Sequence, residues 1–589
     1  MTAQNARITI ATAIGFVRHS APPTCYPEVT VVRIYRVTLI IALCAWSACA
    51  DSSGILGVLS QELTRNFNSL KEKADPPPYF LSYAVTEEDF ALVSASFGAI
   101  TTSNRSRTGG LDVSVRVGSP KLDNYHRVRG DRGQFTSGIA VVIEDNPLAL
   151  KRRLWMDTDR AYRLAAERLI KIRTNSQVKV KEEDQSDDFS EEPPAVFSEA
   201  PPRLKFSAEE WNARARKLSA AFAQYPGILT SSVSVLAQSE TKYLVTTEGT
   251  RLQHGRGFAR VVISAVARAE DGMDLGTSET FEAADPRDLP KDEVILAAIE
   301  HVAKDLTGLL KAPVVDPFVG PAILSGRAAG VFFHEIFGHR VEGHRQKDET
   351  EGQTFTKSVN AAVLPDFLSV VFDPTKRKVG GIDLNGWYRF DDEGVPARPV
   401  SVVENGILKT FLMSRSPIEG FPHSNGHGRR QSGREVVSRQ SNLLVESTRR
   451  VTDAKLREML IAEIKRQNKP YGLYFDNITG GYTTTGRQGL QAFKVIPLVV
   501  YRVYPDGRPD ELVRGADMVG TPLSSFAKIL ATSDRQEVFN GYCGAESGSV
   551  PVSAVSPALL VSEIEIEKKQ KSQDRPPLLA PPASAGGGL

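Results

Sequence analysis

Two-residue alternation of apolar and polar side chains is the feature that most limits the folds open to this chain. It runs through residues 79–138, as in LDVSVRVG at 111–118, and it returns in SVSVL and in ARVVISAVARA. Such alternation predicts antiparallel strands whose two faces meet different surroundings. From Val363 onward the chain is mostly short strand-like segments with Gly-rich turns. Runs of strands beside segregated helices favour an α+β fold.

Helical patterns lie between these strand-like runs. An amphipathic stretch at 56–71 is followed by DPPP at 75–78, which would stop a helix. Ser207, with Glu210 three residues later, forms a capping-box pattern that predicts the start of another helix. We therefore predict helices at 56–71, 146–172, 207–224, 291–310 and 453–466.

The chain has 589 residues, which is room for two to four domains. We predict an N-terminal α/β domain plus a C-terminal β-rich domain that carries an HExxxH helix. The acidic, Ser- and Pro-rich stretch at 181–203 is predicted to be a disordered or extended insertion. The predicted divisions are an export segment (1–50), an N-terminal α+β domain (51–145), a middle domain (146–313), a C-terminal domain (314–567) and a disordered tail (568–589).

The first fifty residues resemble an export signal. Arg33 and Arg36 precede the apolar run VTLIIALCAW at 37–46, and SACA at 47–50 offers a cleavage site before Asp51. This pattern predicts an exported, periplasmic or extracellular protein; the alternative is a cytoplasmic protein with an uncleaved arm. The formal net charge of +2 gives no basic excess, so no nucleic-acid partner is expected.

The number of cysteines in the mature chain depends on cleavage of that signal. Cys25, Cys44 and Cys49 lie in the segment that cleavage would remove, which leaves Cys543 alone. A single thiol cannot form an internal disulfide. In an oxidising compartment we expect such a thiol to be buried, reactive or bound to a metal.

The segment VFFHEIFGHRVEGHRQ at 331–346 holds His334 and His339, five residues apart. At about 100° per residue, an ideal helix would separate these side chains by about 140°, so both imidazoles would not reach one ion. Gly338 could widen the turn or end the helix, so that His339 swings inward. The alternative is a helix end with its histidines near the negative end of the dipole.

A catalytic zinc site needs a third protein ligand, and Cys543 is the candidate, since thiolate is a good zinc ligand. Glu335 follows His334 directly and could act as the general base toward an attacking water. The alternative for Cys543 is an inert buried thiol in a Gly-rich turn. The residues alone leave both alternatives open.

Four motifs in order carry a resemblance to a known family. They are the HExxxH segment with VEGH, DDEGVPARPVSVVENGILKTFL at 391–412, SNGHGRRQ at 424–431 and CGAESGSVPVSAVSPALLV at 543–561. Together they resemble the TldD/PmbA metallopeptidases over roughly residues 79–567, the acidic insertion excepted.

The resemblance implies a Zn²⁺-dependent peptidase with a metallopeptidase domain at 314–567, acting on small or unfolded peptides. It implies His334, His339 and Cys543 as metal ligands and Glu335 as the catalytic residue. In the family, TldD-type subunits keep this motif and PmbA/TldE-type subunits lose it, so this chain resembles the active type. The resemblance further implies a homodimer or a heterodimer with a PmbA/TldE-like subunit.

Other residues admit two interpretations each. Arg429 and Arg430, in a Gly-rich loop, could hold a peptide carboxylate or form an exposed turn. Glu342 and His344 could orient a metal ligand or be solvated residues at a helix end. For the whole chain, the alternative function is a non-catalytic, metal-stabilised binding or partner subunit of a peptidase complex. A hydrolase of a non-peptide bond is a third possibility.

Overall fold

The computed structural model describes most of the chain beyond the first fifty-three residues. The predicted export segment lies outside the described residues, as does most of the predicted tail. Within the described part, no helix has both the length and the apolar character needed to cross a membrane. The described residues are 54–128, 136, 138–142, 144, 146–176, 184–487, 492–520, 522–569, 575–577, 579 and 582.

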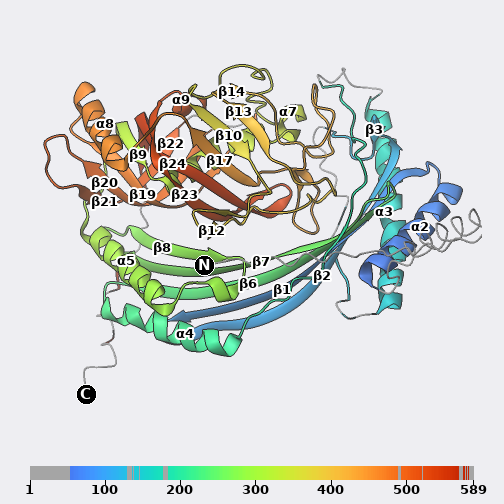
Figure 1. Ribbon diagram of the computed structural model, residues 1–589, viewed down its shortest axis with the longest axis horizontal. Coiled ribbons are helices and arrows are strands. Elements are labelled where there is room, and N and C mark those ends of the chain that lie inside the picture. Colours follow the sequence, from blue (N-terminus) through green and yellow to red (C-terminus); the bar gives the residue numbers. More distant parts are fainter. Residues whose placement is uncertain are drawn as a thin grey trace, which may run out of the picture. The chain divides into compact units, whose positions relative to one another are not determined.

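The first sheet is built from long antiparallel strands, as the alternating pattern predicts (Figure 1). Its path runs β3-β2-β1-β6-β7-β5, with β4 on β2 and β8 on β7. β1 pairs with β6, so the predicted boundary between 145 and 146 runs through one continuous sheet. The strands are β1 (Pro78–Ser96), β2 (Ala99–Ser119), β3 (Leu122–Asp123), β4 (Ile139–Ala140), β5 (Val196–Ser198), β6 (Thr230–Thr246), β7 (Arg251–Arg268) and β8 (Asp274–Ala283).

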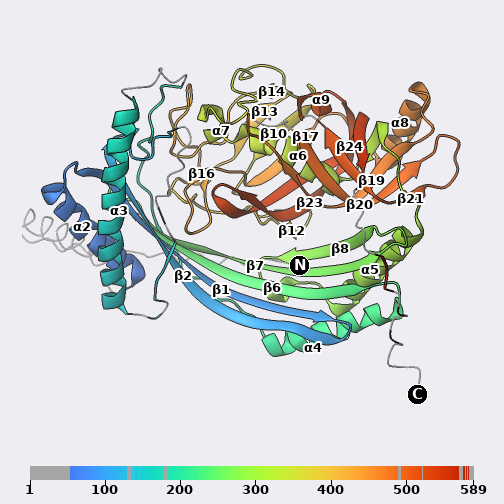
Figure 2. The ribbon, with the colours of Figure 1, turned by 180° about the vertical axis from the view of Figure 1, so that it is seen from behind.

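Four helices pack on this sheet by their apolar faces. α4 (Ala208–Ala220) and α5 (Asp292–Lys311) lie near one end, on the side away from the C-terminal strands, as Figures 1 and 2 show. α2 (Ile55–Lys73) and α3 (Pro147–Ser176) pack at the other end. Ser207 Oγ accepts from the Glu210 N–H, which confirms the predicted N-cap. Two 3₁₀ turns follow along the chain, η1 (Ala221–Gln224) and η2 (Pro286–Asp288).

The C-terminal part is rich in strands and wraps around a central helix. Its twelve-stranded sheet follows the path β14-β13-β10-β17-β24-β22-β20-β19-β9. α6 (Gly326–Ile336) contacts β19, β20, β23 and β24 and is buried on almost every side, although it carries His334 and Glu335 beside its apolar residues. The predicted α+β fold with a β-rich C-terminal domain is confirmed.

The C-terminal part contains further strands and short helices. The sheet contains β9 (Phe318–Leu324), β10 (Leu368–Phe372), β13 (Val400–Glu404), β14 (Ile407–Leu408), β17 (Asn442–Ser447), β18 (Arg450–Val451), β19 (Gly472–Thr483), β20 (Phe493–Val503), β21 (Glu511–Val513), β22 (Ala516–Gly520), β23 (Ile529–Ala545) and β24 (Gly548–Lys568). Smaller pairs are β11 (Lys378–Val379) with β12 (Ile382–Asp383), and β15 (Gly428–Arg429) with β16 (Val437–Ser438). The helices are η3 (Gly338–Val341), α7 (His344–Lys347), α8 (Asp453–Arg466) and α9 (Pro522–Phe526).

The acidic stretch is extended, which excludes the disordered alternative of the prediction. Residues 184–203 are not disordered; they form an extended segment, and β5 within it pairs with β7. Asp188 accepts from the Asp123 N–H and contacts the His126 ring, and the Ser190 N–H donates to the Arg415 carbonyl. Charge and polarity suggested disorder, but these acidic and polar groups have tertiary partners that a composition argument cannot see. Residues 181–183 lie outside the described residues.

Candidate metal centre

The helix that carries His334 ends before it reaches His339. α6 begins at an N-cap, where Ser325 Oγ accepts from the Ala328 N–H, and it stops at Ile336. His339 lies in the following 3₁₀ turn, η3. The change of helix type removes the wide angular separation of an ideal helix. The two rings lie 5.1 Å apart between centroids, with their planes at 79°.

Gly338 lies in this turn at a point where a side chain would collide with Gln440. A Cβ atom built there would lie 1.9 Å from Oε1 of Gln440. The Gln440 amide packs against the turn, and its Nε2 donates to the His334 carbonyl at 3.2 Å. Close packing of the buried Gln440 side chain, and not an unusual backbone angle, therefore favours glycine at this position.

Cys543, more than two hundred residues away in sequence, completes the cluster. β23 brings its Sγ to 3.2 Å from His334 Nε2 and 3.3 Å from His339 Nε2. All three side chains are buried, and their ligand atoms lie within 4.8 Å of one another. Two imidazole nitrogens and one thiolate sulfur are the donors that zinc prefers, and three protein ligands leave a fourth position open. The donor set therefore fits a zinc ion.

The pKa of Cys543 is shifted in the direction that metal binding needs. Burial would raise the pKa of the Cys543 thiol, but the His339 and His334 rings hold it well below its usual range. Burial would lower the pKa of His339, but Cys543 and Glu342 hold it well above its usual range. The shift at Cys543 favours the thiolate, the form that binds metals, and His339 must release its proton before it can bind an ion.

Glu342 lies behind His339 and is fully buried. Its Oε2 is 3.2 Å from His339 Nδ1 and accepts from Arg345 Nε at 2.8 Å. Burial would raise the pKa of Glu342, but His339 and Arg345 lower it to about 2. Arg439 Nε lies 3.4 Å from the other oxygen, and its Nη2 donates to the Cys543 carbonyl at 2.6 Å. The ion pair of Glu342 and Arg439 therefore contacts both His339 and the backbone of Cys543.

Glu335 lies on α6 directly after His334 and is 8% exposed. Within the described part of the chain, no donor forms a hydrogen bond to its carboxylate. Gly481 on β19 lies against it, since a Cβ there would come within 2.9 Å of Glu335 Cγ. The carboxylate is thus available to a substrate or a water.

Two interpretations of nearby residues need correction. Glu342 and His344 are not solvated residues at a helix end: Glu342 is 0% exposed, and His344 is 4% exposed with its Nε2 bonded to Glu546. The alternative of exposed charge is also wrong for Arg429 and Arg430, because both side chains are buried. Neither arginine lies among the three clustered residues, and both line a separate pocket.

Sequence reasoning missed Arg439 and Gln440. Both follow β16 and reach the cluster through their side chains, one at the Cys543 carbonyl and one at the His334 carbonyl. Neither belongs to a metal-ligand pattern, and no spacing relates them to the histidines. Only the packing of 439–440 beside α6 gives them this place.

Replacing Glu342 by Gln is expected to weaken zinc binding by about ten- to hundredfold, the range for partners that orient a metal-bound histidine. Gln keeps the size of the side chain but removes the carboxylate that Arg439 faces, while Arg345 keeps Glu351 and Glu546. Zinc affinity, measured by competition with a chromophoric chelator, is the readout. Glu351→Gln is the matched control, because Glu351 pairs with Arg345 but not with a histidine. Equal affinity in the two variants would contradict the bracing role of Glu342.

Two domain models of known families match the chain beyond residue 200. The PmbA/TldA metallopeptidase central domain matches residues 201–307, and the PmbA/TldA metallopeptidase C-terminal domain matches residues 319–568. The two models belong to one family and together cover more than half of the chain. The chain belongs to the PmbA/TldD family. Its C-terminal match spans the HExxxH segment and Cys543.

Several relatives of this PmbA/TldD chain are named metalloproteases. One from Methanocaldococcus jannaschii is 27% identical over 318 residues, which cover 53% of this chain and 64% of that protein. A metalloprotease TldD homologue from Haemophilus influenzae is 26% identical over 57% of this chain and 67% of its own length. A zinc metalloprotease TldD homologue from Saccharolobus solfataricus is 28% identical over 42% of this chain and 51% of its own length. The chain thus spans one half to two thirds of these relatives.

Solved structures support the fold of this PmbA/TldD member. TldE from Thermococcus kodakarensis covers 85% of this chain and 100% of its own, with a TM-score of 0.58 at 14% identity. A Thermotoga maritima protein described as a candidate modulator of a DNA gyrase covers 86% of this chain and 99% of its own. Its TM-score is 0.58 at 17% identity. At such identities the likeness is one of fold.

Proposed function

We propose that this chain is a zinc-dependent peptidase of the TldD type that hydrolyses small or unfolded peptides. The observation that carries the proposal is the buried cluster of His334, His339 and Cys543, with the Glu335 carboxylate beside it. These three residues would hold the ion through Nε2, Nε2 and Sγ. When bound there, zinc would polarise the peptide carbonyl and increase the acidity of the attacking water.

The side chains of this chain then have separate tasks. Glu335 accepts a proton from the attacking water at its carboxylate and returns it to the nitrogen of the departing amine. Glu342 accepts the Nδ1 hydrogen bond of His339 and so keeps Nε2 turned toward Sγ of Cys543. Gln440 fixes the backbone of His334. The cluster is buried, which excludes bulk water and strengthens each of these electrostatic interactions.

The subunit type and the partner are part of the proposal. The intact HExxxH segment and Cys543 favour a TldD-type, active subunit. The likeness to a TldE structure in fold supports a dimer, with a second copy or with a PmbA/TldE-like subunit. We further propose that the chain is exported to the periplasm or beyond. The apolar run at 37–46 and the small residues at 47–50 support export, and N-terminal sequencing of the mature protein from cell fractions tests it.

The purified full chain is expected to contain about one zinc per chain and to hydrolyse short peptides, with loss of both on chelation and recovery on adding zinc. Metal analysis and mass spectrometry of a peptide panel give the two readouts. An ester panel run in parallel separates a peptidase from a hydrolase of another bond. Zinc content without turnover of any peptide would instead support a non-catalytic, metal-stabilised subunit.

A further inference from the structure

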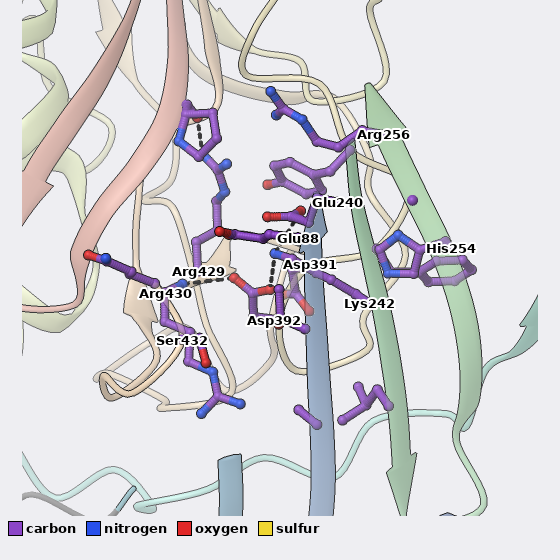
Figure 3. A pocket seen from close by; sticks show the side chains of 18 of the residues that line it. Glu88, Glu240, Lys242, His254, Arg256, Asp391, Asp392, Arg429, Arg430 and Ser432 are labelled. Carbon is purple, nitrogen blue, oxygen red and sulfur yellow. Dashed lines mark hydrogen bonds and ion pairs between the residues drawn. The ribbon is translucent and has the colours of Figure 1, made fainter. Parts of the chain in front are cut away.

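A second site lies where the first sheet faces the C-terminal domain. It is a pocket of about 210 Å³, lined on one side by β1, β6 and β7 and on the other by residues 387–392 and 429–432. Figure 3 shows Glu240, Lys242, His254 and Arg256 extending from the strands toward the segments that carry Asp392 and Arg429. None of the three clustered metal-ligand candidates lines it.

Strand register builds the floor of the pocket. Glu88 on β1 lies opposite Glu240 on β6, and Glu240 lies opposite Arg256 on β7. Lys242 and His254 form the neighbouring pair two residues along. Side chains two residues apart on a strand share a face, so these two rows lie side by side on the face that meets the C-terminal domain.

Two carboxylates in the first row lack a full counter-charge. Carboxylates directly opposite one another on neighbouring strands repel. Within the described residues, Glu88 has no hydrogen bond or ion pair. The nearest cation to Glu240 is Lys242 at 3.6 Å, and Lys242 is already bound by Asp392 at 2.6 Å. The acidic pair therefore favours a ligand that brings a cation.

Two guanidinium groups in the same pocket lack carboxylate partners among the described residues. Arg256 donates only to the backbone carbonyl and side-chain oxygen of Asn385. Arg429 donates to the carbonyls of Gln440 and Pro551 and stacks over the Tyr388 ring at 4.7 Å. A purely cationic ligand would meet these arginines, and a purely anionic ligand would meet the acidic pair.

His254 supplies an independent sign of a binding site. Its side chain is buried, with 8% exposure, and neither ring nitrogen has a hydrogen-bond partner in the described part of the chain. Burial, together with the charge of Lys242, lowers the pKa of His254 to about 4, so the ring is neutral and able to donate or accept. A buried polar ring that faces a cavity without a partner is expected to bind something there.

We propose that this pocket binds a small zwitterion: a free amino acid or a short peptide with both ends unblocked. The ammonium group lies at Glu88 and Glu240, and the carboxylate lies at Arg256 and Arg429. The volume is below the roughly 300–1,000 Å³ of pockets for drug-sized ligands, which suits a ligand of this size. Among the described residues, the group of metal-ligand side chains close enough to share one ion is His334, His339 and Cys543, which lies outside this pocket.

The pocket and the metal centre lie on opposite faces of one hairpin. Tyr542 and Pro551 pair across β23 and β24 and line the pocket. Cys543, the next residue, points to the other face, toward the histidines. A bound zwitterion would therefore contact the strand that carries Cys543 without contacting a ligand of the metal. Binding depends on neither zinc nor peptide hydrolysis, so it can be tested separately from the proposed function.

The test is isothermal titration calorimetry on the purified full chain, before and after removal of metal by a chelator. The probes are dialanine, N-acetyl-dialanine, dialanine amide and free alanine. Dialanine is expected to bind at least about tenfold more tightly than either blocked derivative, since each block removes one charge-assisted contact. The affinity is expected to be the same with and without metal. Comparison of free alanine with dialanine shows whether an amino acid or a peptide fits better.

Matched variants assign the two ends. Glu240→Gln should remove the preference for a free amino group, and Arg256→Gln should remove the preference for a free carboxylate. Glu87→Gln is the control, because Glu87 neighbours Glu88 on the strand but does not line the pocket. Thermal unfolding of each variant reports its folding. If Arg256→Gln does not fold, Glu88→Gln, at an exposed position, tests the ammonium end instead.

Three results would overturn the proposal. The first is equal binding of dialanine and its blocked derivatives. The second is no binding of any probe up to about 10 mM, a concentration at which even a weak site is occupied. The third is binding that disappears when the metal is removed. The last result would place the ligand at the metal centre.

Discussion

Glu335→Gln is expected to lower kcat/KM for peptide hydrolysis by about 10²- to 10⁴-fold, the usual contribution of a positioned general base. Gln has nearly the same shape as Glu but cannot accept a proton at neutral pH. Because Glu335 is not one of the three clustered ligands, zinc content is expected to stay at the wild-type value. Steady-state kinetics on a cleaved peptide and metal analysis of the same preparation give the two measurements.

The control for this substitution is Glu404→Gln, at the exposed end of β13. It removes one carboxylate charge outside the metal cluster, and it is expected to change neither kcat/KM nor the zinc content. Wild-type activity in Glu335→Gln would eliminate the proposed base. Loss of zinc together with activity would show that Glu335 supports the metal and would leave its role in proton transfer without support.

Cys543→Ser is expected to weaken zinc binding by more than about a hundredfold, beyond the range for residues that only orient a ligand. A serine hydroxyl is neutral at pH 7 and is a poor zinc donor compared with thiolate. The change also removes the negative charge that holds the pKa of His339 up, so that ring would lose its main ionic partner in the metal-free protein. Zinc affinity is measured by chelator competition, with Glu342→Gln as the milder reference.

Thermal unfolding of metal-free Cys543→Ser separates ligand loss from misfolding. Serine is close to cysteine in size, and Cys543 packs with Val550 and Val552 in a small buried cluster. A fold as stable as that of metal-free wild type, with zinc affinity lost, supports Cys543 as a ligand. Unchanged zinc stoichiometry and affinity would show that two histidines suffice and that the thiol is structural.

Much of the architecture was predictable because it depends on local patterns. The helix at 453–466 coincides with α8, and the helix at 291–310 differs from α5 (Asp292–Lys311) by one residue at each end. Capping residues and apolar periodicity act within a few residues, so a linear sequence displays them. Whether the acidic stretch is disordered or extended could not be decided from sequence, because the order of residues 184–203 depends on distant partners such as Arg415.

The candidate metal residues were also predictable in part from the sequence and in part only from the fold. The type and order of His334, Glu335, His339 and Cys543 pointed to zinc and to a family without any coordinates. Whether two histidines five residues apart could meet was undecided, because an ideal helix forbids it. The packing of Gln440 against Gly338, the end of α6 at Ile336 and the course of β23 decided it.

Local order in this protein follows from the chain's own periodicity and chemistry, since neighbouring residues dictate helices, strands and candidate ligands. Three arrangements depended instead on residues far apart in sequence. They are the meeting of Cys543 with the histidines, the burial of Glu342 between arginines, and the charged pocket assembled by strand register. Long-range packing of this kind leaves no periodic trace in sequence, because each partner is chosen by the folded core and not by its neighbours.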